Sequence, residues 1–532
     1  MAVATKNCVV DIQQLIVYSE QHGLIQEEDR LWCYNALLEM LSFEGPAPIL
    51  SWNDIDTHSF NLEQTLLQLA RIAVSQNVAE DTQSGEDSFA MRIMGLLMPK
   101  PSEVSHHFYK LYHDISPKAA TNWFYELCCD AGYVRRSAIA KNISWSTKTP
   151  WGDLEITINL SKPEKDPREI ATAKKQTSSD AAYPACQLCL ENEGYAGRSS
   201  SSSAGAHPAR QNLRIIPLEL NHHRWGFQYS PYAYFTEHSI TMNSDHIPMH
   251  IDQSTFINLL EFVDQFPHYF IGSNANLPIV GGSILSHDHY QAGHYEFPMM
   301  RASVSEDFTL HDFPSVEGAI LKWPLSVLRL RSQKRKDLIA ASTYILDTWK
   351  AYSDTSVSIL AESHGEQHNT ITPIVRKLND VYEVYLTLRC NLTSAEHPLG
   401  IFHPHSEYHH IKKENIGLIE VMGLAILPPR LVNELDKIHT IMYQELTNQA
   451  EANTIYGQLT TDPITLSHAE WGRAIYQKLL DKGISSLSSS ELKTYVYDEV
   501  GLVFSHVLEN AGVFKWDTQG REAQRRFIAS LQ

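Results

Sequence analysis

The sequence predicts an α+β protein with antiparallel sheets in the middle of the chain and helices at both ends. Apolar residues recur every three or four positions in about the first 110 residues and again beyond Asn415, which is the period of an α-helix. In segments 154–160 and 214–242 they alternate with polar residues, which is the period of a strand. A chain of 532 residues is too long for one ordinary domain. We therefore expect four regions: 1–150, 151–300, 301–415 and 416–532.

Region 1–150 is expected to be mainly helical. A first helix is marked by apolar residues that should share one of its faces, namely Leu31, Tyr34, Leu37, Leu38 and Leu41. A second helix should begin at Ser116-Pro117, because serine caps a helix and proline suits its first position. It should stop near Gly132.

The strands begin in region 151–300. A half-buried strand is predicted by the alternation of Leu154, Ile156, Ile158 and Leu160 with polar residues. Antiparallel strands are predicted from Arg214 to Met242, on the evidence of Trp225, Phe227, Tyr229, Ile240 and Met242. Two polar stretches cannot bury a core: Lys162–Asp180 is predicted to be a linker, and the serine run Ser199–Ser203 a mobile surface loop.

The order of the later elements predicts an internal repeat. A helix over Ser254–Asp264 should be followed by a turn over Gly272–Asn276 and an apolar strand over Leu277–Val280. Region 301–415 offers a similar order, with a helix at 339–352, strands at 356–361 and 382–389, and a histidine-rich end. In region 416–532 the helical period returns.

Composition and charge exclude several classes of protein. The formal net charge is -19, so the surface repels nucleic acid and anionic lipid, and no dense run of Lys or Arg overrides this. We expect neither a signal peptide nor a membrane span, because no basic segment precedes an apolar run and no apolar stretch reaches about 18 residues. Seven scattered cysteines predict reduced thiols and a cytoplasmic location.

The segment Gly281–Gln291, with the sequence GGSILSHDHYQ, carries the chemistry. On a strand, His287, His289 and Gln291 would share one face, where three polar groups are costly to bury without a ligand or a metal. A neutral imidazole can attack phosphorus and form a phosphoramidate, which divides one displacement into two. The glycines let backbone amides approach phosphate oxygens, and a glutamine amide can donate to them as charge develops. This order of residues favours phosphoryl transfer over a group of surface histidines.

The segment resembles the histidine-triad superfamily and, within it, the second, larger bacterial class of galactose-1-phosphate uridylyltransferases. The resemblance covers most of the chain, most densely between about 180 and 430, and is carried by Tyr183–Arg198, His207–Asn212, Phe227–Pro231, Phe266–Gly282 and His368–Pro373. It implies that region 151–300 is a histidine-triad-like catalytic repeat and region 301–415 a second, degenerate repeat. It also implies an enzyme of galactose metabolism that forms homodimers.

By this resemblance the reaction is a ping-pong exchange. His289 is the nucleophile that attacks the α-phosphorus of UDP-glucose and releases glucose 1-phosphate; galactose 1-phosphate then takes the uridylyl group. Gln291 is the amide that stabilises the phosphate. Asp288 stands where the better-known class has proline, and the second class accepts it. Two other readings stay open: a related nucleotidyl transferase or phosphorylase with a different donor, and a zinc-stabilised nucleotide-binding protein without catalysis.

Cys186 and Cys189 have the C-x-x-C spacing of two zinc ligands, with thiols that bind no metal as the alternative. The resemblance supplies the remaining ligands, because those of zinc-bearing members of the first class match His246 and His287. Such a structural zinc would position His289 without binding it. A second histidine-rich group is left open between a metal site and a contact to the sugar phosphate: His403, His405, His409 and His410.

An acidic protein needs local positive charge to hold the diphosphate of a UDP-sugar. Arg198 and Arg210 flank the serine run and are the candidates, because arginine binds phosphate through two parallel hydrogen bonds. The resemblance adds residues that contact ribose and phosphate, namely Asn274, Asn276, Gly282 and Ser283. The expected partners are UDP-glucose, UDP-galactose and hexose 1-phosphates.

Overall fold

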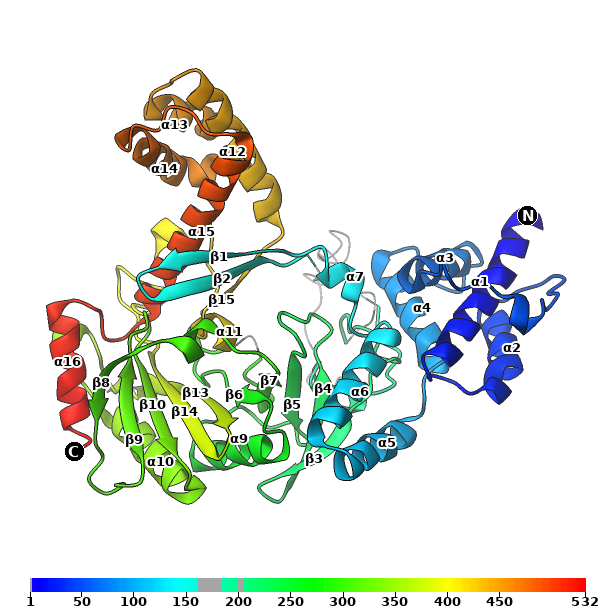
Figure 1. Cartoon of the computed structure of the whole chain (residues 1–532), viewed down its shortest axis with the longest axis horizontal. Helices are drawn as coiled ribbons and strands as arrows, with labels where there is room; N and C mark the ends of the chain where they lie inside the picture. Colours follow the sequence, from blue (N-terminus) through cyan, green and yellow to red (C-terminus); the bar gives the residue numbers. More distant parts are fainter. Residues whose placement is uncertain (1, 161–182, 200–201, 203, 283) are drawn as a thin grey trace. The chain divides into compact units, whose positions relative to one another are not determined.

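The computed structural model describes residues 2–160, 183–199, 202, 204–282 and 284–532 (Figure 1). The predicted linker, Ser283 and part of the serine run lie outside the described residues. The fold is α+β, as the sequence predicts. The chain divides into a first unit (Met1–Ala140, Ser161–Pro248 and Ser286–Gly293) and a second unit (Lys141–Leu160, Met249–Leu285 and His294–Gln532). None of the helices in the described ranges combines the length and the apolar character needed to cross a membrane.

The N-terminal part of the first unit is helical, with α1 (Ala2–Gln21), α2 (Arg30–Met40), α3 (Leu62–Ser75), α4 (Gln83–Leu96), α5 (Pro101–Asp114), α6 (Pro117–Asp130) and α7 (Arg136–Ile139). Helix α6 is confirmed at both ends: the Ser116 side chain accepts from the Ala119 amide, and Gly132 follows with a φ of 64°. Helix α2 is confirmed as well, but Leu31 in its first turn is 52% exposed, so its buried face runs through Tyr34 and Leu37 instead.

The first unit contains an antiparallel sheet in the order β3 (Ile216–Leu220), β4 (His223–Tyr229), β5 (Ser239–Asn243) and β7 (His289–Gly293). The strands predicted between Arg214 and Met242 are confirmed. Helix α6 covers one face, where the Phe124 ring lies 5.3 Å from that of Tyr229, and the Tyr229 hydroxyl donates to the Thr121 carbonyl. Because side chains alternate along a strand, Tyr290 lies on this helix-covered face, and His289 and Gln291 lie on the other.

The second unit contributes six antiparallel strands in the order β6 (Phe270–Gly272), β13 (Asn369–Leu378), β14 (Val381–Cys390), β10 (Val327–Ser332), β9 (Glu317–Leu321) and β8 (Val304–Phe308). Helices α9 (Gln253–Gln265) and α10 (Arg335–Ala351) contact this sheet and each other. Their apolar sides are buried, including Phe256 and Trp349. A short hairpin, β11 (Glu362–Ser363) and β12 (Glu366–Gln367), precedes β13.

The order of elements along the chain repeats, as the predicted tandem repeat requires. Strands β4 and β5, helix α9 and strands β6 and β7 follow one another, and β9, β10, α10, β13 and β14 repeat that order. The pairing repeats too, because β5 pairs antiparallel with β7 and β10 with β14. The helices predicted at 254–264 and 339–352 correspond to α9 and α10, and the strand predicted at 382–389 corresponds to β14, so these predictions are confirmed.

Two predicted strands are wrong. Leu277–Val280 forms a turn, because Pro278 has no amide hydrogen to donate and Ile279 has a φ of 73°. Residues 356–361 form a 3₁₀ turn and a single bridge, because Ser358 adopts the left-handed conformation with a φ of 58°. Both left-handed residues interrupt the extended backbone that a strand needs.

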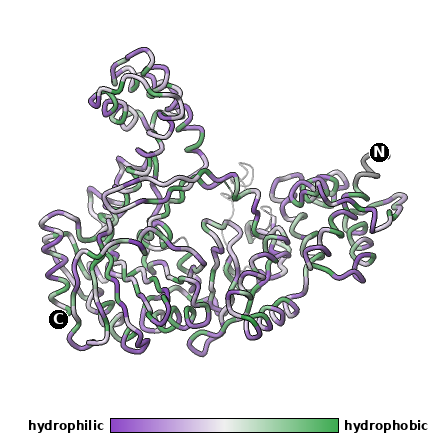
Figure 2. The backbone as a smooth tube through the Cα atoms, viewed as in Figure 1, coloured by the Kyte–Doolittle hydropathy of each residue, from purple (hydrophilic) through white to green (hydrophobic). Residues whose placement is uncertain are grey.

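The C-terminal part of the second unit is mostly helical, with α11 (Leu418–Val421), α12 (Arg430–Thr447), α13 (Ala452–Thr461), α14 (Ala469–Asp481), α15 (Ser489–Ala511) and α16 (Thr518–Ala529). One strand, β15 (Leu424–Leu427), was not predicted: it adds in parallel to β2 (Gly152–Ile158) of the hairpin that β2 forms with β1 (Ile143–Thr149). In Figure 2 hydrophobic and hydrophilic residues alternate along these helices, as amphipathic helices require.

Candidate active site and metal centre

Cys186, Cys189, His246 and His287 form a compact group in the first unit. Their ligand atoms all lie within 4.8 Å of one another. The Cys186 sulfur is 3.2 Å from Nδ1 of His287, the Cys189 sulfur is 3.2 Å from Nδ1 of His246, and the two sulfurs are 3.6 Å apart. Ligands around a tetrahedral zinc lie roughly 3.3–3.8 Å apart, given Zn–S of about 2.3 Å and Zn–N of about 2.0 Å. The group is therefore compatible with a structural zinc.

The surroundings of the group favour metal binding by Cys186 and His287. The Asn192 amide donates to the carbonyls of Cys186 and Cys189 and holds the C-x-x-C turn. Hydrogen bonds from the Cys189 thiol and then from the Leu188 amide lower the pKa of Cys186 to about 7. Nε2 of His287 lies 2.9 Å from the Asn243 carbonyl, so the ring proton is held there and the Nδ1 lone pair faces the sulfurs.

His289 begins strand β7 and is 7% exposed. Its Nδ1 lies 2.8 Å from the carbonyl oxygen of His287, to which it donates, and this leaves the lone pair on Nε2. Among the described residues Nε2 has no hydrogen-bond partner. Burial lowers the pKa of His289 to about 4, so the imidazole is neutral at neutral pH. A neutral ring with one unengaged nitrogen is suited to nucleophilic attack.

Gln291 lies two residues further along β7, on the same face as His289. Its Oε1 is 3.1 Å from Nε2 of His238, and its amide nitrogen has no partner within the described ranges. Tyr290, which lies between His289 and Gln291 in the sequence, points to the opposite face and stacks on Trp225 with ring centroids 4.9 Å apart. The predicted alternation is present for these residues, although β7 begins only at His289 and leaves His287 in the preceding turn.

The asparagines and the glycine predicted to contact the substrate lie in the second unit. Oδ1 of Asn274 accepts from the Leu418 amide, and Oδ1 of Asn276 accepts from the Thr370 hydroxyl. A Cβ atom at Gly282 would lie 2.8 Å from Nδ2 of Asn274, so a side chain here would displace the Asn274 amide. Asn274 and Gly282 are thus in contact, while Ser283 is outside the described residues.

The two predicted arginines are held differently. The guanidinium of Arg198 donates to the backbone carbonyls of Tyr183 and Gly205. Arg210 is 7% exposed, and among the described residues its guanidinium donates only to the neighbouring Ala209 carbonyl and has no carboxylate partner. A buried arginine without an acidic partner suits an anionic ligand. Arg210 is therefore the better placed of the two for a phosphate.

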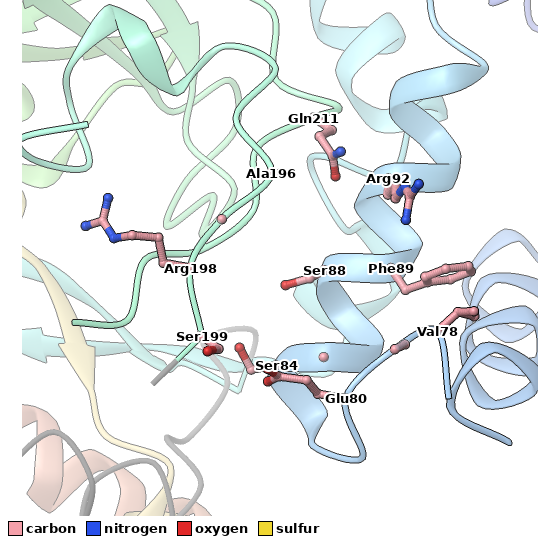
Figure 3. A pocket seen from close by; sticks show the side chains of 13 residues that line it. Val78, Glu80, Ser84, Ser88, Phe89, Arg92, Ala196, Arg198, Ser199 and Gln211 are labelled. Carbon is pink, nitrogen blue, oxygen red and sulfur yellow. The ribbon is translucent and has the colours of Figure 1, made fainter. Parts of the chain in front are cut away.

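A pocket of about 460 Å³ lies next to Arg198, between α4 and the segment 196–199 (Figure 3). Ser84 and Ser88 of α4 line it, but the guanidinium of Arg198 points away from them. None of the metal-cluster residues lines this pocket, and neither does His289. It adds no support to the role predicted for Arg198.

The histidine-rich group at 403–410 does not converge on one point. Within the described ranges, Cys186, Cys189, His246 and His287 are the group whose ligand atoms gather as a metal requires. Nε2 of His405 faces the Ile401 carbonyl, and Nε2 of His409 faces the Pro404 carbonyl. Nε2 of His403 lies 3.2 Å from Oδ1 of Asn415.

Sequence reasoning missed three residues that hold the site together: His238, Asn192 and Asn243. His238 contacts the Gln291 side chain. Asn192 donates to the Cys186 carbonyl, and the carbonyl of Asn243 accepts from His287. Asn192 stands within the segment that carries the family resemblance, and this is a signal that could have found it. His238 precedes β5 and meets β7 across the sheet, so spacing along the chain gives no hint of it.

Comparison with known proteins gives two family matches. "Galactose-1-phosphate uridyl transferase, N-terminal domain" matches residues 53–248, and the C-terminal domain of the same name matches residues 261–453. A galactose-1-phosphate uridylyltransferase of Clostridium acetobutylicum is 46% identical over 521 residues, covering 98% of this chain and 99% of that protein. One of Bacillus subtilis is 44% identical over 521 residues, covering 98% and 97%. No solved structure matches the chain significantly.

Proposed function

The chain belongs to the galactose-1-phosphate uridylyltransferase family, and from this premise we propose that His289 carries the uridylyl group through a two-step exchange. The enzyme transfers that group from UDP-glucose to galactose 1-phosphate and yields UDP-galactose and glucose 1-phosphate. The observation that carries the proposal is the state of His289, which is neutral, fixed through Nδ1 and unengaged at Nε2 among the described residues.

In the first step Nε2 of His289 attacks the α-phosphorus of UDP-glucose. A phosphorus–nitrogen bond forms, and the bond from the α-phosphorus to the bridging oxygen breaks, so that its electron pair leaves with glucose 1-phosphate. The ring becomes positively charged, and the His287 carbonyl, which accepts from Nδ1, stabilises this charge. In the second step a phosphate oxygen of galactose 1-phosphate attacks, and the phosphorus–nitrogen bond breaks.

Gln291 stabilises the charge that develops on the phosphoryl oxygens. Its Oε1 faces His238, so its amide hydrogens are free to point toward a phosphate on the same face as His289. A donor that is already oriented needs no reorganisation as the charge grows, and this makes it effective in catalysis.

We propose that Cys186, Cys189, His246 and His287 hold a zinc ion. Two sulfurs and two imidazole nitrogens within 4.8 Å of one another are a usual zinc donor set. The metal, when bound, would join the segments that carry these four residues and would take no part in the chemistry on the substrate. It fixes His287, whose carbonyl fixes the ring of His289.

Arg210, Asn274, Asn276, Gly282 and Ser283 are proposed to bind the nucleotide and its phosphates, and Arg198 is proposed to shape the loop that carries it. The lack of an acidic partner for Arg210 in the described part of the chain supports its role. The contact that Gly282 makes with Asn274 supports a close approach of backbone to phosphate. Homodimer formation and a cytoplasmic location stay predictions.

The test is covalent labelling with UDP-glucose that carries radioactive phosphorus in the α position. The native enzyme should retain acid-labile, base-stable label without acceptor and lose it when galactose 1-phosphate is added. Failure of a folded sample to label would contradict the proposal and favour a nucleotide-binding protein without catalysis. Equal labelling from a different nucleotide would favour a related transferase with another donor.

A further inference from the structure

His238 is a buried histidine that the reaction outlined above does not use. It is 3% exposed and lies directly before strand β5, next to β7 in the same sheet of the first unit. Its Nε2 is 3.1 Å from Oε1 of Gln291. Its other ring nitrogen, Nδ1, is buried without a hydrogen-bond partner among the described residues.

The backbone around His238 fixes the ring in place. The His238 amide donates to the Phe235 carbonyl, its own carbonyl accepts from the Ser230 amide, and its ring packs 4.6 Å from that of Phe235. Glu237, the residue before it, has a φ of 56°, which commits the chain to a tight turn.

Strand β7 is shaped to receive this turn. A Cβ atom at Gly293 would lie 2.7 Å from the Glu237 carbonyl oxygen and 2.7 Å from the Phe235 ring. The absence of a side chain at Gly293 therefore lets the turn rest directly on the end of the strand that carries Gln291. The two backbone segments that carry His238 and Gln291 are therefore packed directly against each other.

The direction of the hydrogen bond follows from the atoms that meet. Oε1 of Gln291 can only accept, so Nε2 of His238 carries the proton and donates. Burial lowers the pKa of His238 to about 4, and the ring stays in this neutral form near neutral pH. A half-turn of the Gln291 amide would require the His238 proton to move to Nδ1, where it would be buried without an acceptor among the described residues.

We propose that His238 is a positioning residue for uridylyl transfer: it holds the Gln291 amide with its N–H groups toward the phosphoryl oxygens. This inference rests on the proposed function, because it assigns His238 a part in stabilising the charge that forms when His289 attacks. His238 acts through Gln291 and does not itself touch the substrate.

The experiment measures the single-turnover rate of His289 uridylylation by rapid quench with α-labelled UDP-glucose. His238→Phe keeps an aromatic ring but has no donor, and it should slow uridylylation by roughly 10-fold or more with little change in KM. His238→Gln places an amide donor near the position of Nε2 and should recover most of the lost rate. Melting temperatures of all variants show whether each is folded.

The same substitution is then made in a Gln291→Ala background, where there is no amide to orient. There His238→Phe should change the rate by less than about 2-fold, because the two residues act as one unit. Equal slowing in both backgrounds, or a His238→Gln variant as slow as His238→Phe, would overturn the inference while labelling of the native enzyme upholds the proposed function. Absence of label in the native enzyme would overturn both.

Discussion

Nδ1 of His289 donates to the carbonyl oxygen of His287, 2.8 Å away. The side chain of His287 belongs to the metal group, while its backbone fixes the tautomer of the proposed nucleophile. One residue therefore couples the stability of the metal group to the reactivity of the neighbouring ring. The predictions for His289→Ala and Cys186→Ser follow from this arrangement.

Replacement of His289 by alanine should abolish turnover and leave the fold intact. The side chain supplies the nucleophile, and loss of such a group costs on the order of 10⁴-fold or more in kcat. Steady-state assays with both sugar phosphates, together with circular dichroism, measure the two effects. His223→Ala, at an exposed histidine that begins β4, is the control and should keep full activity. Substantial activity in His289→Ala would disprove the assignment of the nucleophile.

The rate of uridylylation should resist mild acid. His289 reacts as the neutral ring, and burial lowers its pKa to about 4, so the rate should hold from neutral pH to about pH 5 and fall below that. A histidine with an ordinary pKa would already lose half its reactivity at about pH 6.5. Brief single-turnover reactions after a pH jump give the profile. An apparent pKa of about 6.5 would contradict this prediction, because it would show that the His289 ring is exposed to water.

The same pKa shifts should lower stability in acid. His238 and His289 both titrate at about 4 in the folded chain, against about 6.5 when unfolded. The unfolded chain therefore binds more protons between these values, and the free energy of unfolding should fall as the pH drops from about 6.5 to 4. The loss is at most roughly 3 kcal/mol for each ring, and urea unfolding across this range measures it.

Cys186→Ser should reduce stability more than it alters the chemical step. It removes one ligand of the proposed structural metal, which would stabilise only the folded chain. We expect the melting temperature of the native enzyme to fall when a strong chelator is added, and that of Cys186→Ser to be low already and insensitive to chelator. Cys33→Ser, at a buried cysteine of α2 outside the metal group, should keep the chelator response. Fully active native enzyme without bound zinc would refute the metal assignment.

Gly282→Ala should weaken substrate binding with little loss of stability. The new methyl group would press on Nδ2 of Asn274 from 2.8 Å and displace an amide proposed to bind the nucleotide. We expect KM for UDP-glucose to rise about 10-fold, since displacements near 1 Å can cost up to about 100-fold. Gly457→Ala in α13, where no atom lies within 4 Å of the added group, is the matched control. An unchanged KM in Gly282→Ala would remove this loop from the binding site.

Lys515 should stabilise the C-terminal end of helix α15. Its Nζ donates to the carbonyls of Glu509, Asn510 and Gly512, each at 2.9 Å, and the Glu509 carbonyl also accepts from the Gly512 amide. Lys515→Met should lower the free energy of unfolding by roughly 3 kcal/mol, because three part-buried carbonyl oxygens lose a charged donor. Lys493→Met breaks an exposed pair between Lys493 of α15 and Asp436 of α12 and should cost less than about 1 kcal/mol. Urea unfolding of both variants tests the contrast.

The sequence by itself determined the elements whose signals are local. Helix α6 has a capping serine and a stopping glycine, and the apolar alternation from Trp225 onward marks β4, because these patterns act within a few residues. The segment from Gly281 to Gln291 likewise indicated phosphoryl transfer before any fold was known. The false strand at Leu277–Val280 came from apolar composition alone, which does not reveal the left-handed backbone of Ile279.

The tertiary structure decided what depends on contacts between distant segments. Cys186 and His287 are separated by 101 residues and meet because two turns pack together, and β15 pairs with a hairpin formed by residues 143–158. The link from His238 to Gln291 exists because β5 and β7 are neighbours in a sheet, and no spacing rule encodes that. Local propensity selects each element, but burial and hydrogen bonding across the whole chain select which side chains come together.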